Sequence, residues 1–422
     1  LFAKNKFHFG ILGSTNFLEL GASMSSKERE SRQYKFFLNK VGAGSIVDDH
    51  DMTGTVEDIY DTYVRPEIPY DERSLVLGQL FKAADLYDAD VDETAVFVNA
   101  FSRPWSRMEI LLGVRYVDFS QSIYQYLEDR ENPDMSKRRL IARVPTELTV
   151  RDFHPSAGVK LIITDEDIVD IGLSQTFIAP DLREFTEGVY FHPYEVATIK
   201  GNPELVNTDI YSVDLKYGHY FSKIENIKLG PFFKYLDNPI EDVMERSSSL
   251  PIYGFDNANY AVIYGLEIDG RKDFAFIHRA LRNFYISGNF SYTKSEVTLT
   301  EEQETVYSSN KRELQGQSPI VINVTLGYGS GDRSVTLSYN KMWERIRKVG
   351  MIDDGDRYPD DHEDPAHLLD FVWIEKFECG IALKAKAGNI LHGKTVWRQG
   401  DNVTKEYRKP TTFSLGLSYT YN

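Results

Sequence analysis

The stretch FSLGLSYTY, Phe413 to Tyr421, alternates large apolar or aromatic side chains with small polar ones. Successive residues of a β-strand point to opposite sides of the sheet, so this alternation predicts a strand with one apolar face. Phe413, Leu415, Leu417, Tyr419 and Tyr421 form that face. Such a strand fits two architectures, a soluble β-sandwich and a barrel whose outer surface contacts lipid.

The same period of two recurs along the whole of residues 1–422, in about 15 segments. No convincing amphipathic helix of three turns or more stands between these segments. No run of about 18 apolar residues occurs either, so the sequence contains no candidate for a transmembrane helix. The sequence therefore predicts an all-β chain.

The connections between the predicted strands alternate in length. Short turns such as RPWSR, TDEDI, SKIEN, GSGD and ECG alternate with long segments, and KDFAFIHRALR is intermediate where a short one is due. The long segments are 40–92, 128–147, 179–208, 238–260, 300–317, 348–365 and 391–410. Bacterial outer-membrane barrels have short periplasmic turns and long extracellular loops, whereas a soluble sandwich has no reason to keep this parity. We therefore predict a transmembrane, antiparallel, up-and-down β-barrel.

The polar faces of the predicted strands carry ionisable residues. A charge facing hydrocarbon at the middle of the bilayer costs about 2–4 kcal/mol, so these faces are expected to line a hydrated lumen. Five such residues are candidates for contact with a plug or a passing substrate, although plain solvation with cross-strand ion pairs is the favoured interpretation for each of them: Arg115, Glu267, Asp269, Lys384 and Lys386.

Strand number predicts that this chain is part of a larger barrel. Single-chain bacterial barrels have an even number of strands, and an open edge in lipid leaves costly unpaired backbone groups. The first predicted strand also runs from outside to inside, as an even-numbered strand does. Residues 1–422, which begin without Met, are therefore expected to be the C-terminal portion of a barrel with an odd number of earlier strands.

Composition argues against several functions. The net charge of −16, with 64 acidic and 48 basic residues, argues against a nucleic-acid partner. The single cysteine, Cys379, excludes an internal disulfide and a cysteine-based zinc site. No nucleophile elbow, zinc-protease motif or phosphate-binding glycine loop occurs. We expect neither an enzyme nor a bound cofactor.

Several stretches resemble TonB-dependent outer-membrane receptors, particularly those of the Bacteroidetes type. The most specific is GNPELVNTDIYSVDLKYGHYF, and SQTFIAPDLREFT, RELQGQSPIVINVTLGY, HLLDFVWIEKF and LKAKAGNIL follow the family's order. The resemblance implies a 22-stranded barrel with a plug domain, of which seven strands and the plug are not in this sequence. It also implies that the last strand, Phe413 to Tyr421, is read as an insertion signal by the barrel-insertion machinery.

The long loops supply the remaining candidates. Asp48, Asp49 and Asp51 are weak candidates for a metal site, and a solvated acidic loop is the alternative; we interpret Asp353 to Asp364 in the same way. Such loops are expected to meet lipopolysaccharide phosphates through divalent ions or to attract cationic ligands. Aromatic residues in the outer loops are candidates for ligand or partner contacts: Tyr190, Phe191, Tyr194, Tyr358 and Trp397.

The resemblance implies a Gram-negative outer-membrane receptor that binds a scarce ligand and imports it when TonB pulls on the plug. The ligand stays open among a siderophore, haem, cobalamin, a peptide and an oligosaccharide. Two alternatives remain. One is a structural, assembly or secretion-complex barrel that holds a surface lipoprotein or another outer-membrane protein, and the other is a passive porin of about 16 strands.

Overall fold

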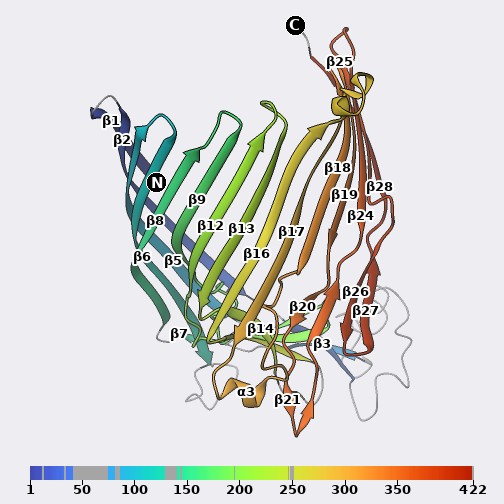
Figure 1. The fold of residues 1–422 in the computed structure, drawn as a ribbon. Coiled ribbons are helices and arrows are strands. Elements are labelled where there is room, and N and C mark those ends of the chain that lie inside the picture. The colour runs from blue at the N-terminus through green and yellow to red at the C-terminus, as the bar shows by residue number, and fades with distance from the viewer. Residues whose placement is uncertain are drawn as a thin grey trace.

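The structure is a computed structural model that describes residues 1–11, 14–32, 35–40, 75–80, 86–128, 140–142, 145–193, 195–245, 247 and 251–420. One antiparallel sheet dominates it, and its 15 consecutive strands follow one another in chain order (Figure 1). Among the described residues, no helix is both long and apolar enough to cross a membrane. The predicted all-β chain is confirmed.

The strands of the main sheet correspond to the segments with a period of two. The first eight are β1 (Phe2–Ile11), β2 (Ser14–Arg32), β5 (Leu86–Trp105), β6 (Met108–Glu128), β8 (Thr146–Ile162), β9 (Asp167–Ile178), β12 (Thr208–Tyr220) and β13 (Asn226–Asp237). The other seven are β16 (Tyr260–Asp273), β17 (Phe284–Thr298), β18 (Ile320–Ser330), β19 (Arg333–Met342), β24 (Leu368–Lys376), β25 (Ile381–Gly388) and β28 (Thr412–Tyr419). A short strand, β7 (Leu140–Ala142), pairs with the end of β6, and β3 (Lys35–Lys40) pairs with β4 (Leu75–Leu80).

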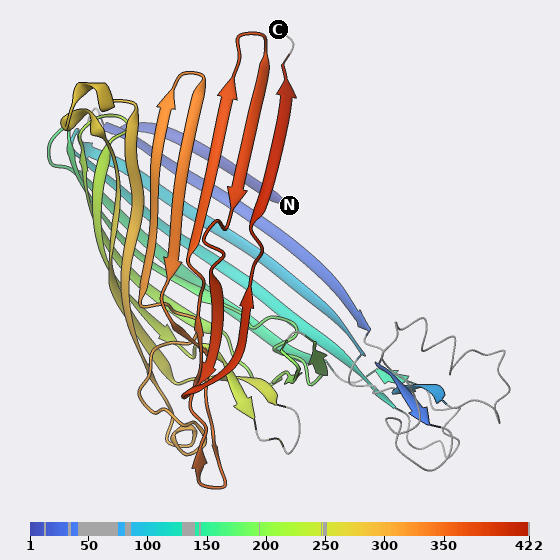
Figure 2. The ribbon, with the colours of Figure 1, turned by 90° about the vertical axis from the view of Figure 1, so that its right-hand side faces the viewer.

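The predicted parity of the connections is confirmed. Short turns join the strands at the upper end of Figures 1 and 2, and the long connections gather at the lower end. At the short-turn end, the intermediate connection 274–283 forms two 3-10 helices, η4 (Phe274–Phe276) and η5 (Arg279–Leu281). The long-connection end is therefore where a loop-built site is expected.

Backbone register places the two kinds of side chain on opposite faces of the sheet. On β12, the side chains of Tyr211, Val213, Leu215 and Tyr217 are 41–45% exposed on one face, as expected for a surface that contacts lipid. Ser212 pairs with Ser174 of β9 and with Lys234 of β13 on the other face. Pairing across the sheet fixes which residues share a face, because a slip of one residue would exchange the two faces.

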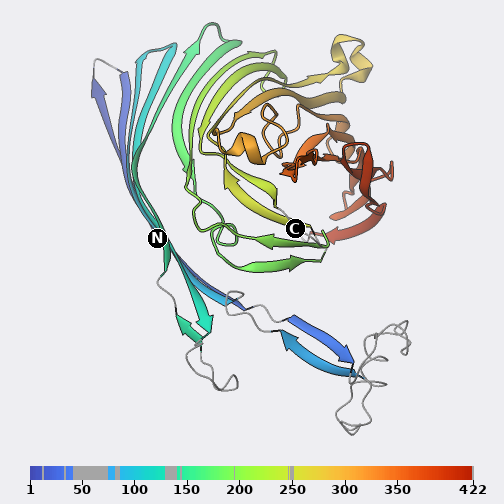
Figure 3. The ribbon, with the colours of Figure 1, turned by 90° about the horizontal axis from the view of Figure 1, so that it is seen from below.

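The sheet curves around the long connections. Seen from the loop end, it forms an arc that opens between β1 and β28 (Figure 3). The later loop elements lie inside the arc or across its opening, whereas the hairpin β3–β4 lies outside it. Among the described strands, β1 and β28 are the two edges of the sheet. These edges present the unpaired backbone groups that a closed barrel in lipid must satisfy.

The buried core lies at the loop end. A transmembrane strand needs only about 9–11 residues, so β5 and β6, with 20 and 21 residues, reach beyond a bilayer. Their projecting ends bury Tyr87, Ala89 and Ile123 against Leu182, Phe185 and Leu205 of the connection between β9 and β12. The sheet thus provides the platform on which the outer loops fold.

Candidate functional site at the loop end

The long connections form small sheets of their own. One sheet contains β10 (Val189–His192), β11 (Ala197–Lys200), β15 (Ile252–Asn257) and β14 (Ile240–Glu245), in that order. The parallel pairing of β11 with β15 joins residues 179–207 to residues 238–259. A further bridge between Val243 and Val349 adds the connection between β19 and β24. Three connections from different parts of the chain are therefore held together by backbone hydrogen bonds.

A second small sheet lies beside the first. It contains β20 (Arg345–Lys348), β23 (Asp361–Asp364), β26 (Lys394–Gln399) and β27 (Asn402–Arg408). The remaining loop elements are the one-turn helix α3 (Gln303–Val306) and the two-residue strands β21 (Ile352–Asp353) and β22 (Asp356–Arg357). Apolar side chains from three connections and the adjoining strand ends share one buried cluster: Leu236, Val243, Ala258, Ala261, Val297, Leu299, Tyr307 and Val349.

Arg347 is the centre of a charged cluster inside these loops. Its Nε lies 3.2 Å from Asp361 Oδ2, and its Nη1 lies 3.0 Å from Glu195 Oε2. The guanidinium also lies 4.0 Å from the ring centre of Trp397 and 5.8 Å from that of Tyr253. Burial alone would lower the pKa of Arg347, but the attraction of Asp361 and Glu195 outweighs it and raises the pKa. Arg347 is therefore held as a cation between two carboxylates and two aromatic faces.

This cluster corrects the expected solvated acidic loop for the second half of Asp353 to Asp364, whereas residues 354–359 are exposed as expected. Asp360 and Asp361 are only 7% and 3% exposed. Asp360 Oδ1 accepts a hydrogen bond from the backbone N–H of Gly350 at 2.8 Å, and Asp361 pairs with Arg347. The acidic segment DHED of β23 pairs in antiparallel register with the basic segment RIRK of β20. Asp360 and Asp361 are thus buried because a backbone N–H and a basic strand pair with their carboxylates.

Two adjoining hollows open beside β14 and β15. The first has a volume of about 230 Å³ and is lined by Met244, Tyr253, Met351 and the half-exposed Tyr358. The second, of about 460 Å³, shares Met244 and Met351 and adds Tyr307 among other residues. Flexible thioethers beside aromatic rings make part of the lining adaptable, and Glu245, Asp353 and Asp256 make the rest of it polar.

A third hollow, which we call the Tyr190 pocket, has a volume of about 380 Å³ and is lined by Arg32, Arg183, Tyr190, Phe191 and His192, among others. The Arg183 guanidinium lies 5.3 Å from the ring centre of Tyr190. Burial raises the pKa of the Tyr190 hydroxyl, so the phenol stays neutral at physiological pH. Neutral aromatic rings beside an exposed arginine suit a ligand with planar groups and negative charge.

The structure places the predicted outer-loop residues in different surroundings. Tyr190 and Phe191 lie together in the Tyr190 pocket, and Tyr358 lies in the smallest of the three hollows. Trp397 is only 7% exposed and contacts Arg347 and Lys405 within the packed loops. Tyr194 lies outside the described residues, as do the metal candidates Asp48, Asp49 and Asp51. In the part of the chain that the structure describes, no group of three or more potential metal ligands occurs.

The five predicted lumen residues share one face of the sheet, opposite the apolar face, as the register shows. Arg115 Nη2 lies 2.6 Å from Glu93 Oε1 and 3.1 Å from the Ser23 hydroxyl. Asp269 pairs with Lys216 at 3.1 Å, and Lys386 lies 4.0 Å from Asp370. Glu267 lies opposite Gly230 and Ser291 on the neighbouring strands. Lys384 lies opposite Ile374 and Gly416. Their contact with a substrate or plug stays a prediction.

The terminal strand exposes its apolar face strongly. Phe413, Leu415, Leu417 and Tyr419 are 65–80% exposed on β28. Their register partners on β25 are Ala387, Ala385, Leu383 and Ile381, which belong to the same apolar face. Tyr421, the last residue of the predicted insertion signal, lies outside the described residues.

Several residues of the hollows and of the charged cluster were not predicted from the sequence, namely Arg183, Met244, Tyr253 and Met351 in the hollows and Arg347 in the cluster. They lie in connections where spacing carries no periodic signal. One signal was available for Arg347, because the basic run RIRK and the acidic run DHED are separated by a DDGD turn. Oppositely charged runs on either side of a turn favour a hairpin with cross-strand ion pairs.

Comparison with known proteins agrees with this architecture. Residues 8–422 match the family model described as TonB dependent receptor-like, beta-barrel. Among curated proteins, no match was found.

Solved structures share the fold at low sequence identity. The ferric-catecholate import receptor Fiu of E. coli K12 is 12% identical, with a TM-score of 0.62 over 99% of this chain and 54% of that one. The siderophore receptor PiuA of Acinetobacter baumannii is 12% identical, with a TM-score of 0.57 and the same coverage. A variant of the ferric enterobactin receptor PfeA of Pseudomonas aeruginosa is 14% identical, with a TM-score of 0.56 over 99% and 53% of the two chains. The chain spans about half the length of the solved structures that it matches.

Proposed function

Because this chain belongs to the TonB-dependent receptor β-barrel family, we propose that the protein binds a scarce extracellular ligand and imports it into the periplasm. The protein is located in the outer membrane of a Gram-negative bacterium. The family consists of receptors and transporters, and we assign no covalent chemistry to this chain. Membership of the Bacteroidetes type stays a prediction.

The observation that carries this proposal is the family match over residues 8–422 of a sheet with one apolar and one ionisable face. The apolar face suits acyl chains, and the ionisable face suits the water of a lumen. We further propose that strands outside residues 1–422 pair with the edges β1 and β28, because hydrocarbon cannot satisfy their free backbone groups. A plug and TonB itself are the partners that this function requires.

We propose the Tyr190 pocket as a ligand contact at the loop end. Arg183, Tyr190 and Phe191 offer one exposed cation and two aromatic rings, which together favour an anionic ligand with planar groups. A siderophore and haem fit this description, and the similar structures named above include a siderophore receptor and a ferric enterobactin receptor. Cobalamin, a peptide and an oligosaccharide stay open as ligands.

The proposal is tested by uptake in the native bacterium. Strains that lack this gene, or lack TonB, are compared with the parent for growth on each candidate ligand as the limiting nutrient. We expect both deletions to abolish the use of the same ligand, and the gene with Tyr190→Ala and Phe191→Ala to restore it only weakly. Uptake that continues without TonB would contradict active import and favour the porin.

The alternative function, a barrel that holds other surface proteins, is tested by a different measurement. Loss of a surface lipoprotein or another outer-membrane protein from the deletion strain, with unchanged growth on every ligand, would favour a structural barrel. Purification in mild detergent, followed by identification of retained proteins, shows which partner is held.

A further inference from the structure

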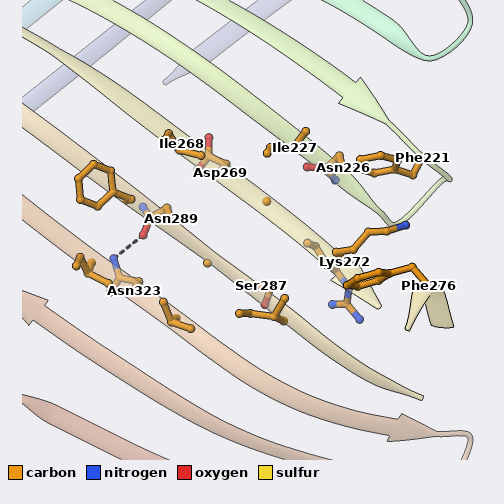
Figure 4. Close-up of a pocket in the computed structure, with 17 residues that line it drawn as sticks. Phe221, Asn226, Ile227, Ile268, Asp269, Lys272, Phe276, Ser287, Asn289 and Asn323 are labelled. Carbon is orange, nitrogen blue, oxygen red and sulfur yellow. Dashed lines mark hydrogen bonds between the residues drawn. The ribbon is translucent and has the colours of Figure 1, made fainter. Parts of the chain in front are cut away.

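A groove crosses the apolar face of the sheet near the short-turn end. Gly270 of β16 and Gly288 of β17 are register partners, with Ile227 of β13 and Val324 of β18 on either side. Two neighbouring positions without side chains leave a hollow of about 470 Å³ that reaches the backbone (Figure 4).

The walls of this groove are almost entirely apolar. One wall is the row of Ile268, Phe290 and Ile322, which pair in register on β16, β17 and β18. Ile286 lies on the opposite side, beside Lys272, its register partner. The backbone groups at the floor are already paired within the sheet, so the groove offers hydrocarbon contact without an unsatisfied polar group.

The end of the groove carries aromatic and cationic groups. Phe221 and Phe276 border it, and Lys272 Nζ lies 4.3 Å from the ring centre of Phe221 and 2.9 Å from Glu225 Oε1 (Figure 4). Phe276 is 66% exposed and Ile277 is 62% exposed. An aromatic side chain beside a long cationic one is typical of the level where acyl chains meet headgroups.

The adjoining connection, residues 274–283, carries net positive charge among apolar residues. It contains Arg279 and Arg282, both exposed, and no acidic residue, in a chain whose net charge is −16. Within the described part of the chain, neither guanidinium has a carboxylate partner. Since the charge of Lys272 is balanced by Glu225, these two arginines supply the uncompensated positive charge beside the groove.

We propose that this groove and connection 274–283 form a binding site for one anionic glycerophospholipid of the periplasmic leaflet. An acyl chain lies over Gly270 and Gly288, and the phosphate lies at Arg279 and Arg282. The face is embedded in a bilayer, so hydrocarbon fills the groove, and the basic connection selects an anionic headgroup. The site depends on the orientation of the barrel in the membrane and not on ligand import.

The test uses the full-length protein that carries this chain, purified in detergent and stripped of lipid. Phosphatidylglycerol or phosphatidylcholine is added, and native mass spectrometry counts the retained lipids. We expect one phosphatidylglycerol molecule to be retained in preference to phosphatidylcholine. Since a basic residue near the surface is worth about 1 kcal/mol, or about fivefold in affinity, Arg279→Gln with Arg282→Gln should weaken this preference about 25-fold.

The groove itself is tested by Gly270→Leu. A Cβ at Gly270 would lie 3.3 Å from the backbone oxygen of Asn226, a contact that a small shift relieves. Gly288 is unsuitable, because a Cβ there would lie 2.2 Å from the backbone oxygen of Asn323. We expect Gly270→Leu to abolish retention while the barrel stays folded by circular dichroism.

Matched controls separate the site from the general lipid surface. Ala100→Leu adds the same kind of side chain to the exposed apolar face of β5, and Arg107→Gln with Lys376→Gln removes two charges at other short turns. Both should retain phosphatidylglycerol as the parent does. Equal retention by the parent and Gly270→Leu, or equal retention of the two lipids by the parent, would overturn the proposal.

Discussion

Arg312 and Glu241, 71 residues apart in the chain, are joined by two parallel hydrogen bonds. Arg312 Nη1 donates to Glu241 Oε1 at 2.7 Å, and Nη2 donates to Oε2 at 2.6 Å. Their side chains are only 4% and 2% exposed. The pair joins the connection between β17 and β18 to β14, and so links residues 299–319 to residues 238–259 at the loop end.

Removing one partner of this pair should loosen the loop end. Glu241→Leu leaves the Arg312 guanidinium buried without a carboxylate, and losing one partner of a buried ion pair costs about 3–5 kcal/mol. We expect faster hydrogen exchange in residues 238–245 and 299–319, measured by mass spectrometry. The double variant Glu241→Leu with Arg312→Leu is the control, since it removes both charges and should keep most of the protection. Unchanged exchange in the single variant would show that the pair does not hold the loops.

Arg347 should shield Trp397 from solvent. Arg347→Gln removes the cation that lies 4.0 Å from the indole ring and leaves Asp361 buried without its partner. We expect acrylamide, an uncharged quencher, to quench tryptophan fluorescence more strongly in this variant, and the increase to vanish when Trp397→Phe is added. Arg345→Gln, which affects the more exposed pair with Glu363, should change quenching little. Equal quenching in Arg347→Gln and the parent would contradict the shielding role.

Glu184 should make the connection 181–188 sensitive to pH. Burial raises the pKa of this carboxyl above 4.5, so the folded connection binds the proton more tightly than the unfolded one. The protonated Glu184 carboxyl therefore adds its full stabilisation of the folded connection below about pH 4.5, the ordinary pKa of a glutamate. This stabilisation is lost as the pH rises through the raised pKa of the folded state. Hydrogen exchange, corrected for its intrinsic pH dependence, should be slower in mildly acidic than in neutral buffer. Glu184→Gln should abolish the difference, and a change of opposite sign would contradict the assignment.

Charge tolerance should differ between neighbouring positions of β12. Val213 lies near the middle of β12, so lysine there faces hydrocarbon and should lower the free energy of unfolding by about 2–4 kcal/mol. Lysine at Ser212 faces the lumen and should cost well under 1 kcal/mol. Urea unfolding of the full-length protein in lipid vesicles measures both. Equal costs at the two positions would contradict the assignment of the two faces.

The sequence predicts the sheet well because period-two alternation and loop parity are properties of neighbouring residues. The faces of β12 and β25 follow directly from the alternation in DIYSVDLKYGHY and IALKAKAG. The loop end is different, because its structure depends on partners far apart in the chain. Asp361 is buried by Arg347, and Thr198 meets Ile252, through pairings that no local pattern encodes. The groove at Gly270 and Gly288 likewise needs the register of two strands.

The orientation of β12 tests the whole account most directly. Every native cysteine of the full-length protein, Cys379 included, is replaced by serine, and single cysteines at 211–218 are spin-labelled in lipid vesicles. Accessibility to oxygen, which partitions into hydrocarbon, is compared with accessibility to a water-soluble nickel complex. The account predicts oxygen maxima at Tyr211, Val213, Leu215 and Tyr217, and nickel maxima at Ser212, Asp214, Lys216 and Gly218. Maxima that coincide, or that fall on the opposite positions, would contradict a barrel with its apolar face in the membrane.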